Sequence, residues 1–270
     1  MSVISVDVAG IGFWTHGLPS WAAASAFLRN GTTEAAAPAK PVSRLLAANE
    51  RRRAPETVAV ALEVALAACE DAGADPAMLP SVFASMHGDL AITDYMCATL
   101  ADDPRAISPT KFHNSVHNAA AGYWTIGTGC NRPTTALSSG DGSFASGLLE
   151  ALSQLQSGEP AVLLAAYDSQ SAGPLARISS SEGLLGGALV LASHADSAVA
   201  RLQVEFLNAP APLAPGKLAA YVGANAMSPM LPLFEALANG GGEAWLHAGP
   251  SQALHITITH RPLSCRPLSY

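Results

Sequence analysis

Charged residues are scarce in this sequence of 270 residues. Asp, Glu, Lys and Arg make up 13% of it, against roughly 25% in an ordinary soluble domain. Hydrophobic residues make up 49%. A monomer must keep a large surface in contact with water, so this shortage favours a subunit whose exposed area is partly covered by another chain. The alternative interpretation is an alanine-rich sequence in which small residues replace polar ones.

Positive charge is especially rare. The chain has three lysines, a net charge of −7, and one short basic run at residues 51–53. Neutralising the phosphates of a nucleic acid requires a basic stripe. We therefore expect no nucleic-acid partner.

Long apolar runs and patterned cysteines are also missing. No window reaches about 18 unbroken apolar residues, so no membrane span is expected. The N-terminus has no positively charged region and resembles a strand rather than a signal peptide. The cysteines form no C-x-x-C pair or regular spacing, which predicts free thiols in a reducing cytoplasm, with no disulfide framework, metal site or cofactor. These cysteines are Cys69, Cys97, Cys130 and Cys265.

Strand and helix patterns alternate along the chain. Residues 55–72 have apolar residues at helical spacing, and Gly73 is suited to end that helix. Residues 161–167 form a wholly apolar run, typical of a strand buried on both faces of a sheet. An acidic stretch after Gly88 is predicted to be a loop, and residues 243–248 and 253–260 to be edge strands. The alternation indicates an α/β sandwich, which we interpret as one domain over residues 1–270.

Residues 134–149 combine a buried strand, a sharp turn and a helix that begins with small residues. The pattern places Ser139 at a helix N-terminus, where backbone N–H groups favour negative charge. Enzymes place nucleophiles at such turns, although a serine there still needs a base. The alternative is that Ser138, Ser139 and Asp141 only cap the helix.

This turn resembles the nucleophile elbow of the β-ketoacyl synthases and the wider thiolase-like superfamily. Ser139 takes the position of the family's cysteine, and Gly142 and Gly147 take those of two glycines. Residues 118–122 resemble the family's Asn-Ala-x-Ala-Gly run. Residues 181–191 resemble its Gly-Glu-Gly-Ala segment, although Gly186 replaces the glutamate. The resemblance covers roughly residues 1–205, and the elbow comprises Ser138, Ser139, Gly140, Asp141 and Gly142.

A second segment makes the resemblance more specific. Residues 112–119, FHNSVHNA, are similar to the small branch of synthase-like proteins found with aryl polyene pathways. The resemblance implies a thiolase-like α/β half, with a mixed, mainly parallel sheet between helix layers and extra C-terminal strands. Residues 206–270 would form a family-specific helix and strands.

Two departures from the family determine the expected function. Ser139 replaces the cysteine, and a serine alcohol is almost fully protonated and accepts acyl groups less readily than a thiolate. The resemblance also ends near residue 205, whereas both catalytic histidines of full-length synthases lie in their second half. The sequence therefore lacks the residues that the family uses for condensation.

His113 and His117 are the candidates to replace those histidines. Their spacing of four would place both on one face of a helix, as a base pair or metal ligands need. Asn118 shares the segment, and these polar residues could instead fix a turn through hydrogen bonds to the backbone. Structural, catalytic and metal-binding roles stay open here.

The resemblance implies a chain-length-factor-like subunit that forms a heterodimer with a full-length β-ketoacyl synthase and meets acyl carrier protein through that complex. Without the synthase, this chain could form a homodimer. The alternatives are a Ser139-dependent acyltransferase or thioesterase acting on carrier-bound acyl chains, and an acyl-binding scaffold. Candidate pocket or interface residues are Phe112, Tyr123, Trp124 and Phe144.

Overall fold

The computed structural model describes residues 3–34, 36–212 and 215–260; Cys265 therefore lies outside the described residues. One eight-stranded sheet runs through this part of the chain, in the order β3-β2-β4-β5-β1-β6-β8-β7. Its strands are β1 (Ile4–Thr15), β2 (Ser81–Ala84), β3 (Thr134–Leu137), β4 (Ala161–Asp168), β5 (Leu185–Ala192), β6 (Ala200–Leu207), β7 (Gly241–Gly249) and β8 (Gln252–His260).

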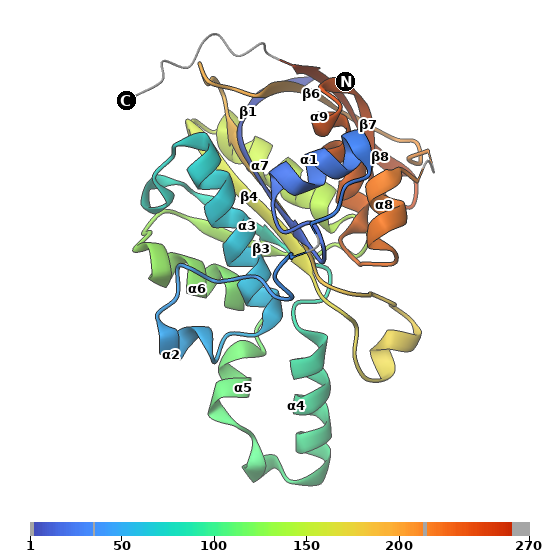
Figure 1. Cartoon of the computed structure of the whole chain (residues 1–270). Helices are drawn as coiled ribbons and strands as arrows, with labels where there is room; N and C mark the ends of the chain where they lie inside the picture. The colour runs from blue at the N-terminus through green and yellow to red at the C-terminus, as the bar shows by residue number, and fades with distance from the viewer. Residues whose placement is uncertain (1–2, 35, 213–214, 261–270) are drawn as a thin grey trace.

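Helices cover the sheet, and one pair extends away from it (Figure 1). The α-helices are α1 (Trp21–Asn30), α2 (Ala48–Arg51), α3 (Glu56–Ala72), α4 (Leu90–Asp102), α5 (Pro109–Asn114), α6 (Ala119–Thr128), α7 (Ser143–Gln156), α8 (Lys217–Val222) and α9 (Leu231–Ala238). Among the described residues, no helix has the length and apolar character needed to cross a membrane.

The expected α/β fold with a mixed sheet is confirmed, but parallel pairing is less extensive than the family resemblance implied. Only β2 with β3 and β2 with β4 are parallel. The other pairs of neighbouring strands are antiparallel. Apolar strands carry no mark of their direction, which explains this difference. Of the two predicted edge strands, β7 is at the edge, whereas β8 lies between β6 and β7.

Alternating side chains of the strands feed two cores, one on each face of the sheet. Val82 and Ala84 of β2 face the core beneath α1, α7 and α9. Phe83, between them, faces the core beneath α3 and α6. Strands β4 and β5 are buried almost throughout, as the apolar run in β4 predicts.

Helix α3 lies unusually close to β1. A Cβ atom on Gly12 would lie 2.0 Å from the carbonyl oxygen of Val64, which is closer than any side chain can come. The helix ends where the sequence predicts, at Gly73 in the left-handed conformation with φ 63°. Glycine in β1 thus sets how deeply α3 packs on the sheet.

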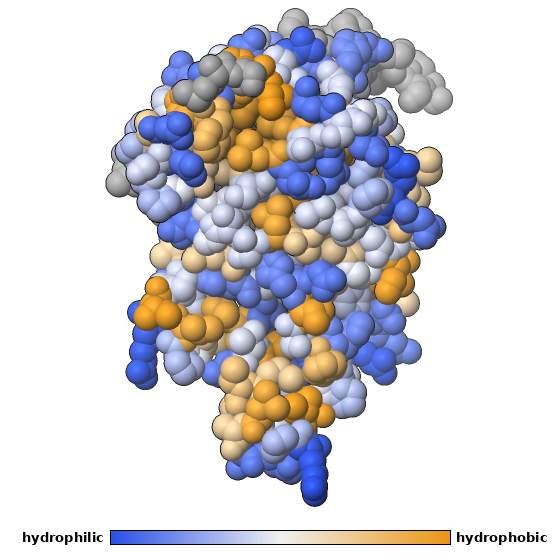
Figure 2. Space-filling model, turned by 180° about the vertical axis from the view of Figure 1, so that it is seen from behind, coloured by the Kyte–Doolittle hydropathy of each residue, from blue (hydrophilic) through white to orange (hydrophobic). Residues whose placement is uncertain are grey.

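The stretch after Gly88 is not the loop that its acidic composition predicts. It forms α4 and, after a short turn, α5, and this arm projects from the body of the molecule (Figure 1). Only Leu90 and Ile92 of α4 are buried, both in its first turn. Hydrophobic residues gather on the arm when the molecule is viewed from behind (Figure 2), and its exposed side chains include Leu100 and Phe112.

Candidate functional site

The carboxyl ends of the three parallel strands meet at one end of the sheet. β3 leads into Ser138, β2 leads into Ser85, and β4 ends at Asp168. Open α/β sheets bind ligands outside the carboxyl ends of their strands. The predicted elbow therefore lies where this class of fold places its binding sites.

The elbow is a tight turn between β3 and α7. The amide of Gly142 donates a hydrogen bond of 3.1 Å to the carbonyl of Ser139, and Gly140 has a φ of 56°. Helix α7 begins only at Ser143, with Gly142 as its N-cap and no side-chain capping bond. Ser139 thus lies ahead of the helix rather than in its first turn, and the alternative prediction, that side chains of the turn cap the helix, is wrong.

The surroundings of Ser139 bear on whether its hydroxyl could accept an acyl group. Its side chain is exposed, and its hydroxyl has no hydrogen-bond partner among the residues that the structure describes. Its amide donates to Ser143 Oγ over 2.9 Å, and that hydroxyl donates to the carbonyl of Gly140 over 2.6 Å. A serine nucleophile needs a base within hydrogen-bond reach, and an oxyanion needs free N–H donors. Among the described residues no base contacts the Ser139 hydroxyl, and the N–H of Ser139 is already engaged.

A buried carboxylate ties the strand ends together behind the elbow. Asp168 accepts hydrogen bonds from Ser85 Oγ (2.8 Å), the amide of Met86 (2.8 Å) and the amide of His87 (3.2 Å). The carbonyl of Met86 accepts the Ser138 hydroxyl over 2.9 Å. Burial raises the pKa of Asp168 to about 7, although its three hydrogen bonds act in the opposite direction.

The motif glycines of the elbow serve close packing. A Cβ atom on Gly147 would lie 3.0 Å from Leu164 Cδ1 and 3.1 Å from the Cβ of Ala84. A Cβ atom on Gly142 would lie 3.1 Å from the carbonyl oxygen of Ala248 in β7. Both glycines therefore let the start of α7 approach the sheet, whatever residue occupies the nucleophile position.

The two histidines before the elbow are not on one helical face. Helix α5 ends at Asn114, so His113 lies in its last turn and His117 follows the helix. The His113 ring packs edge-on against Tyr123, with centroids 5.7 Å apart. His117 Nε2 lies 2.9 Å from the carbonyl oxygen of Ser85. Each ring thus has a structural contact, and the predicted helical arrangement is wrong.

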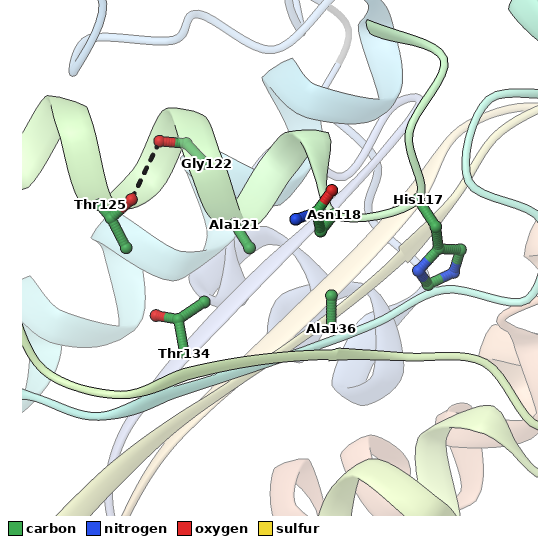
Figure 3. Close-up of a pocket in the computed structure, with 7 residues that line it drawn as sticks. All are labelled: His117, Asn118, Ala121, Gly122, Thr125, Thr134 and Ala136. Carbon is green, nitrogen blue, oxygen red and sulfur yellow. Dashed lines mark hydrogen bonds between the residues drawn. The ribbon is translucent and has the colours of Figure 1, made fainter.

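A groove runs between α6 and the free edge of β3 (Figure 3). Its volume is about 490 Å³. Most of its lining side chains are small, and Asn118 stands at the N-cap of α6, beside its mouth. The lining residues are His117, Asn118, Ala121, Gly122, Thr125, Thr134 and Ala136.

A second, apolar groove of about 560 Å³ lies on the other side of α6, and Asn118 and Gly122 line both grooves. Phe112 lines it with 61% of its surface exposed, beside Tyr123 and the exposed Ile126. Two of the predicted interface residues lie elsewhere. Trp124 and Phe144 are fully buried, one in each core, so neither offers surface to another molecule.

The sequence gives no sign of one close pair of polar side chains, His87 and Ser179. His87 Nε2 lies 2.7 Å from Ser179 Oγ. The two residues are 92 positions apart, and neither belongs to a motif, so no spacing signal could have found them. Burial lowers the pKa of His87, and the charge of Asp141 acts in the opposite direction.

The cysteines offer no ligand set. Cys69 and Cys130 are buried and Cys97 is exposed, and burial raises the pKa of Cys69 to about 12. Within the described ranges, no group of three or more His, Cys, Asp or Glu residues could hold a metal ion.

Comparison with known proteins gives the context of this geometry. The family model described as "Beta-ketoacyl synthase, N-terminal domain" matches residues 20–240. No curated protein matches the sequence significantly.

Several solved structures share the fold along nearly their full matched chains. A ketosynthase in complex with its chain length factor from Xenorhabdus doucetiae matches with a TM-score of 0.71 at 20% identity, covering 94% of this chain and 99% of that one. The ishigamide ketosynthase/chain length factor matches with a TM-score of 0.69 at 16% identity, over 96% and 100% of the two chains. A type II PKS acyl-carrier protein in complex with its ketosynthase matches with a TM-score of 0.73 at 12% identity, over 96% and 100%. At these identities the likeness establishes the fold.

Proposed function

We propose that this chain, which belongs to the β-ketoacyl synthase N-terminal domain family, is a non-catalytic, chain-length-factor-like partner subunit of a β-ketoacyl–acyl carrier protein synthase. The observation that carries the proposal is the turn at Ser139, where the hydroxyl has no base beside it and the amide is bonded to Ser143. A subunit without an acyl-accepting group at the elbow contributes shape and apolar surface, instead of chemistry, to the condensation.

The two edges of the sheet support a subunit interface at β3. The edge strand β7 has an irregularity in register near Gly249 and carries the exposed Glu243, and both features discourage strand pairing. Strand β3, Thr134–Leu137, carries neither a charge nor such an irregularity. The groove of Figure 3 lies directly beside it. A second chain docking here would cover surface that has few charged groups.

The names of the matched structures support one kind of partner. Two of the matched structures are named for a ketosynthase and its chain length factor, and a third contains an acyl-carrier protein. We extend this to the present chain as a heterodimer with a full-length synthase, with carrier protein reached through that complex. The segment at residues 112–119 favours aryl polyene or a related polyketide or fatty-acid-type pathway.

Co-expression with a full-length β-ketoacyl synthase from the same organism tests the assembly. We expect a heterodimer that co-purifies and stays intact in size-exclusion chromatography with light scattering. A stable monomer that never associates with the synthase would contradict the proposal, and would favour the acyl-binding scaffold.

An acylation assay tests the proposal that Ser139 accepts no acyl group. After incubation with acyl carrier protein bearing a thioester, peptide mapping should find no ester on Ser139. An ester there that disappears in Ser139→Ala would favour the acyltransferase or thioesterase alternative instead. His117 would then have to exchange its contact with the Ser85 carbonyl for one with Ser139.

A further inference from the structure

A serine and a histidine lie in hydrogen-bond contact close to the elbow, and neither takes part in the proposed subunit role. Ser179 Oγ and His87 Nε2 are 2.7 Å apart. His87 follows β2, and Ser179 belongs to the connection between β4 and β5. Both side chains are half-buried. A serine within reach of an imidazole nitrogen is the arrangement that activates a serine nucleophile.

The Ser179 backbone is fixed from both sides, which limits how far its hydroxyl can move from the ring. Its amide donates to the carbonyl of Leu175 over 2.9 Å. Its carbonyl accepts the hydroxyl of Ser171 over 2.9 Å. His87 is held in turn by its amide, which donates to Asp168 over 3.2 Å. The pair is therefore positioned by the folded backbone, as a reactive pair requires.

The surroundings suit the neutral ring and an acyl group. Burial lowers the pKa of His87, so the imidazole is free to accept a proton near neutral pH, while the charge of Asp141 favours the protonated ring once formed. Ile178, next to Ser179, is 82% exposed, and Leu175 is 43% exposed. Both residues belong to the turn that carries Ser179, so this turn offers exposed apolar side chains to an acyl group.

We propose that Ser179 is an acyl-accepting nucleophile, with His87 as its general base, toward small apolar acyl thioesters. Ser179 Oγ forms a bond to the thioester carbonyl carbon as His87 Nε2 takes the hydroxyl proton. The C–S bond then breaks, and the departing sulfur receives that proton. The products are an ester on Ser179 and a free thiol, with no oxidant or reductant involved.

The second ring nitrogen of His87, Nδ1, limits the expected rate of acylation and hence which acyl donors can react. A base role places the ring proton on Nδ1, which is buried and has no partner in the described part of the chain. An unsatisfied buried donor is unfavourable, so the protonated Nδ1 works against the base role. The amide of Ser179 is also engaged, with the carbonyl of Leu175, so it gives no help to an oxyanion. We therefore expect slow acylation that needs a thioester, whose thiolate leaves with little assistance. This inference is independent of the proposed partner role, because it uses neither β3 nor Ser139.

The experiment incubates the purified chain with the octanoyl thioester of N-acetylcysteamine and follows intact mass over hours. We expect one octanoyl addition that peptide mapping assigns to Ser179. It should be absent in Ser179→Ala and at least tenfold slower in His87→Gln. Ser180→Ala, which alters the exposed neighbouring serine, and Ser139→Ala should react like the wild type.

A folded wild-type chain that takes up no octanoyl group would overturn the proposal. An unchanged octanoylation rate in His87→Gln would also overturn it, because the octanoyl group would then be added without a base at His87. Near-UV circular dichroism checks that each variant is folded. Ser179→Cys provides a second readout: its thiol should react with iodoacetamide at least tenfold faster when His87 is present than in the double variant with His87→Gln, and equal rates would also refute the pairing.

Discussion

Asp168 shows how one side chain organises the end of the sheet. Its carboxylate receives three hydrogen bonds from residues 85–87, and the same turn receives the hydroxyl of Ser138. Its backbone carbonyl accepts the side-chain amide of Asn225, at 3.4 Å. The turns after β2 and β3 thus depend on a buried acidic group.

The burial of Asp168 predicts that the chain loses stability as pH rises. The folded pKa, about 7, lies above the ordinary value of 3.8, so the folded state binds more protons than the unfolded state between these values. The contribution is full below about pH 4 and is lost as pH rises through 7, at a limiting slope of about 1.4 kcal/mol per pH unit. Denaturation in urea at several pH values should show this fall.

Two variants test whether Asp168 causes this fall of stability with pH. Asp168→Asn should be less stable at pH 5 but should lack the fall attributed to this group. Asp196→Asn, which alters an exposed carboxylate after β5, should keep it. A wild-type slope that survives in Asp168→Asn would show that another group titrates.

At the scale of elements, glycine decides whether a helix can approach its neighbour. α3 crosses β1 where a Cβ on Gly12 would overlap the Val64 carbonyl. In α6, by contrast, a Cβ on Gly122 would meet no atom within 4 Å. The same residue type is thus required in one element and replaceable in the other.

This contrast predicts opposite effects of the same substitution. Gly12→Ala should destabilise the chain by about 1–3 kcal/mol or more, because α3 must move away from the sheet. Gly122→Ala should stabilise it by roughly 0.5–1 kcal/mol, because alanine favours a helix more than glycine does. Urea denaturation of the two variants measures both effects. Equal losses of stability would contradict the packing of α3 described above.

The sequence predicts elements whose burial leaves a pattern. The apolar run of β4, the spacing in α3 and its end at Gly73 were all recognisable. α4 was not, because only its first turn is buried and the rest of the helix shows no face. Strand direction was hidden for a related reason, since β5 is equally apolar whichever way it runs. The placement of Ser139 ahead of α7, and the contact between His87 and Ser179, depend on loop geometry that spacing does not encode.

At the scale of the whole molecule, the groove beside β3 is the proposed site of contact with a second chain. Gly122 lines both this groove and the apolar groove at Phe112. A Cβ atom on Gly122 would meet no atom within 4 Å, so a side chain can begin there without a clash. A blocking variant is therefore available.

Gly122→Arg should weaken association with the synthase at least tenfold. The arginine would fill the groove and bring a further charge into a contact that has few charged groups. Gly122→Ala, the matched control, should bind as the wild type does. Co-purification and titration calorimetry measure both, and equal binding by the arginine variant would place the interface elsewhere.

The bare edge of β3 has a consequence for how such a protein can be made. Its outward-facing backbone groups accept any extended segment that arrives, including the same strand of another copy. Chains synthesised in excess of their partner would therefore pair with one another through this edge. The yield of the correct assembly would then depend on matching translation of this chain to that of whatever covers the edge.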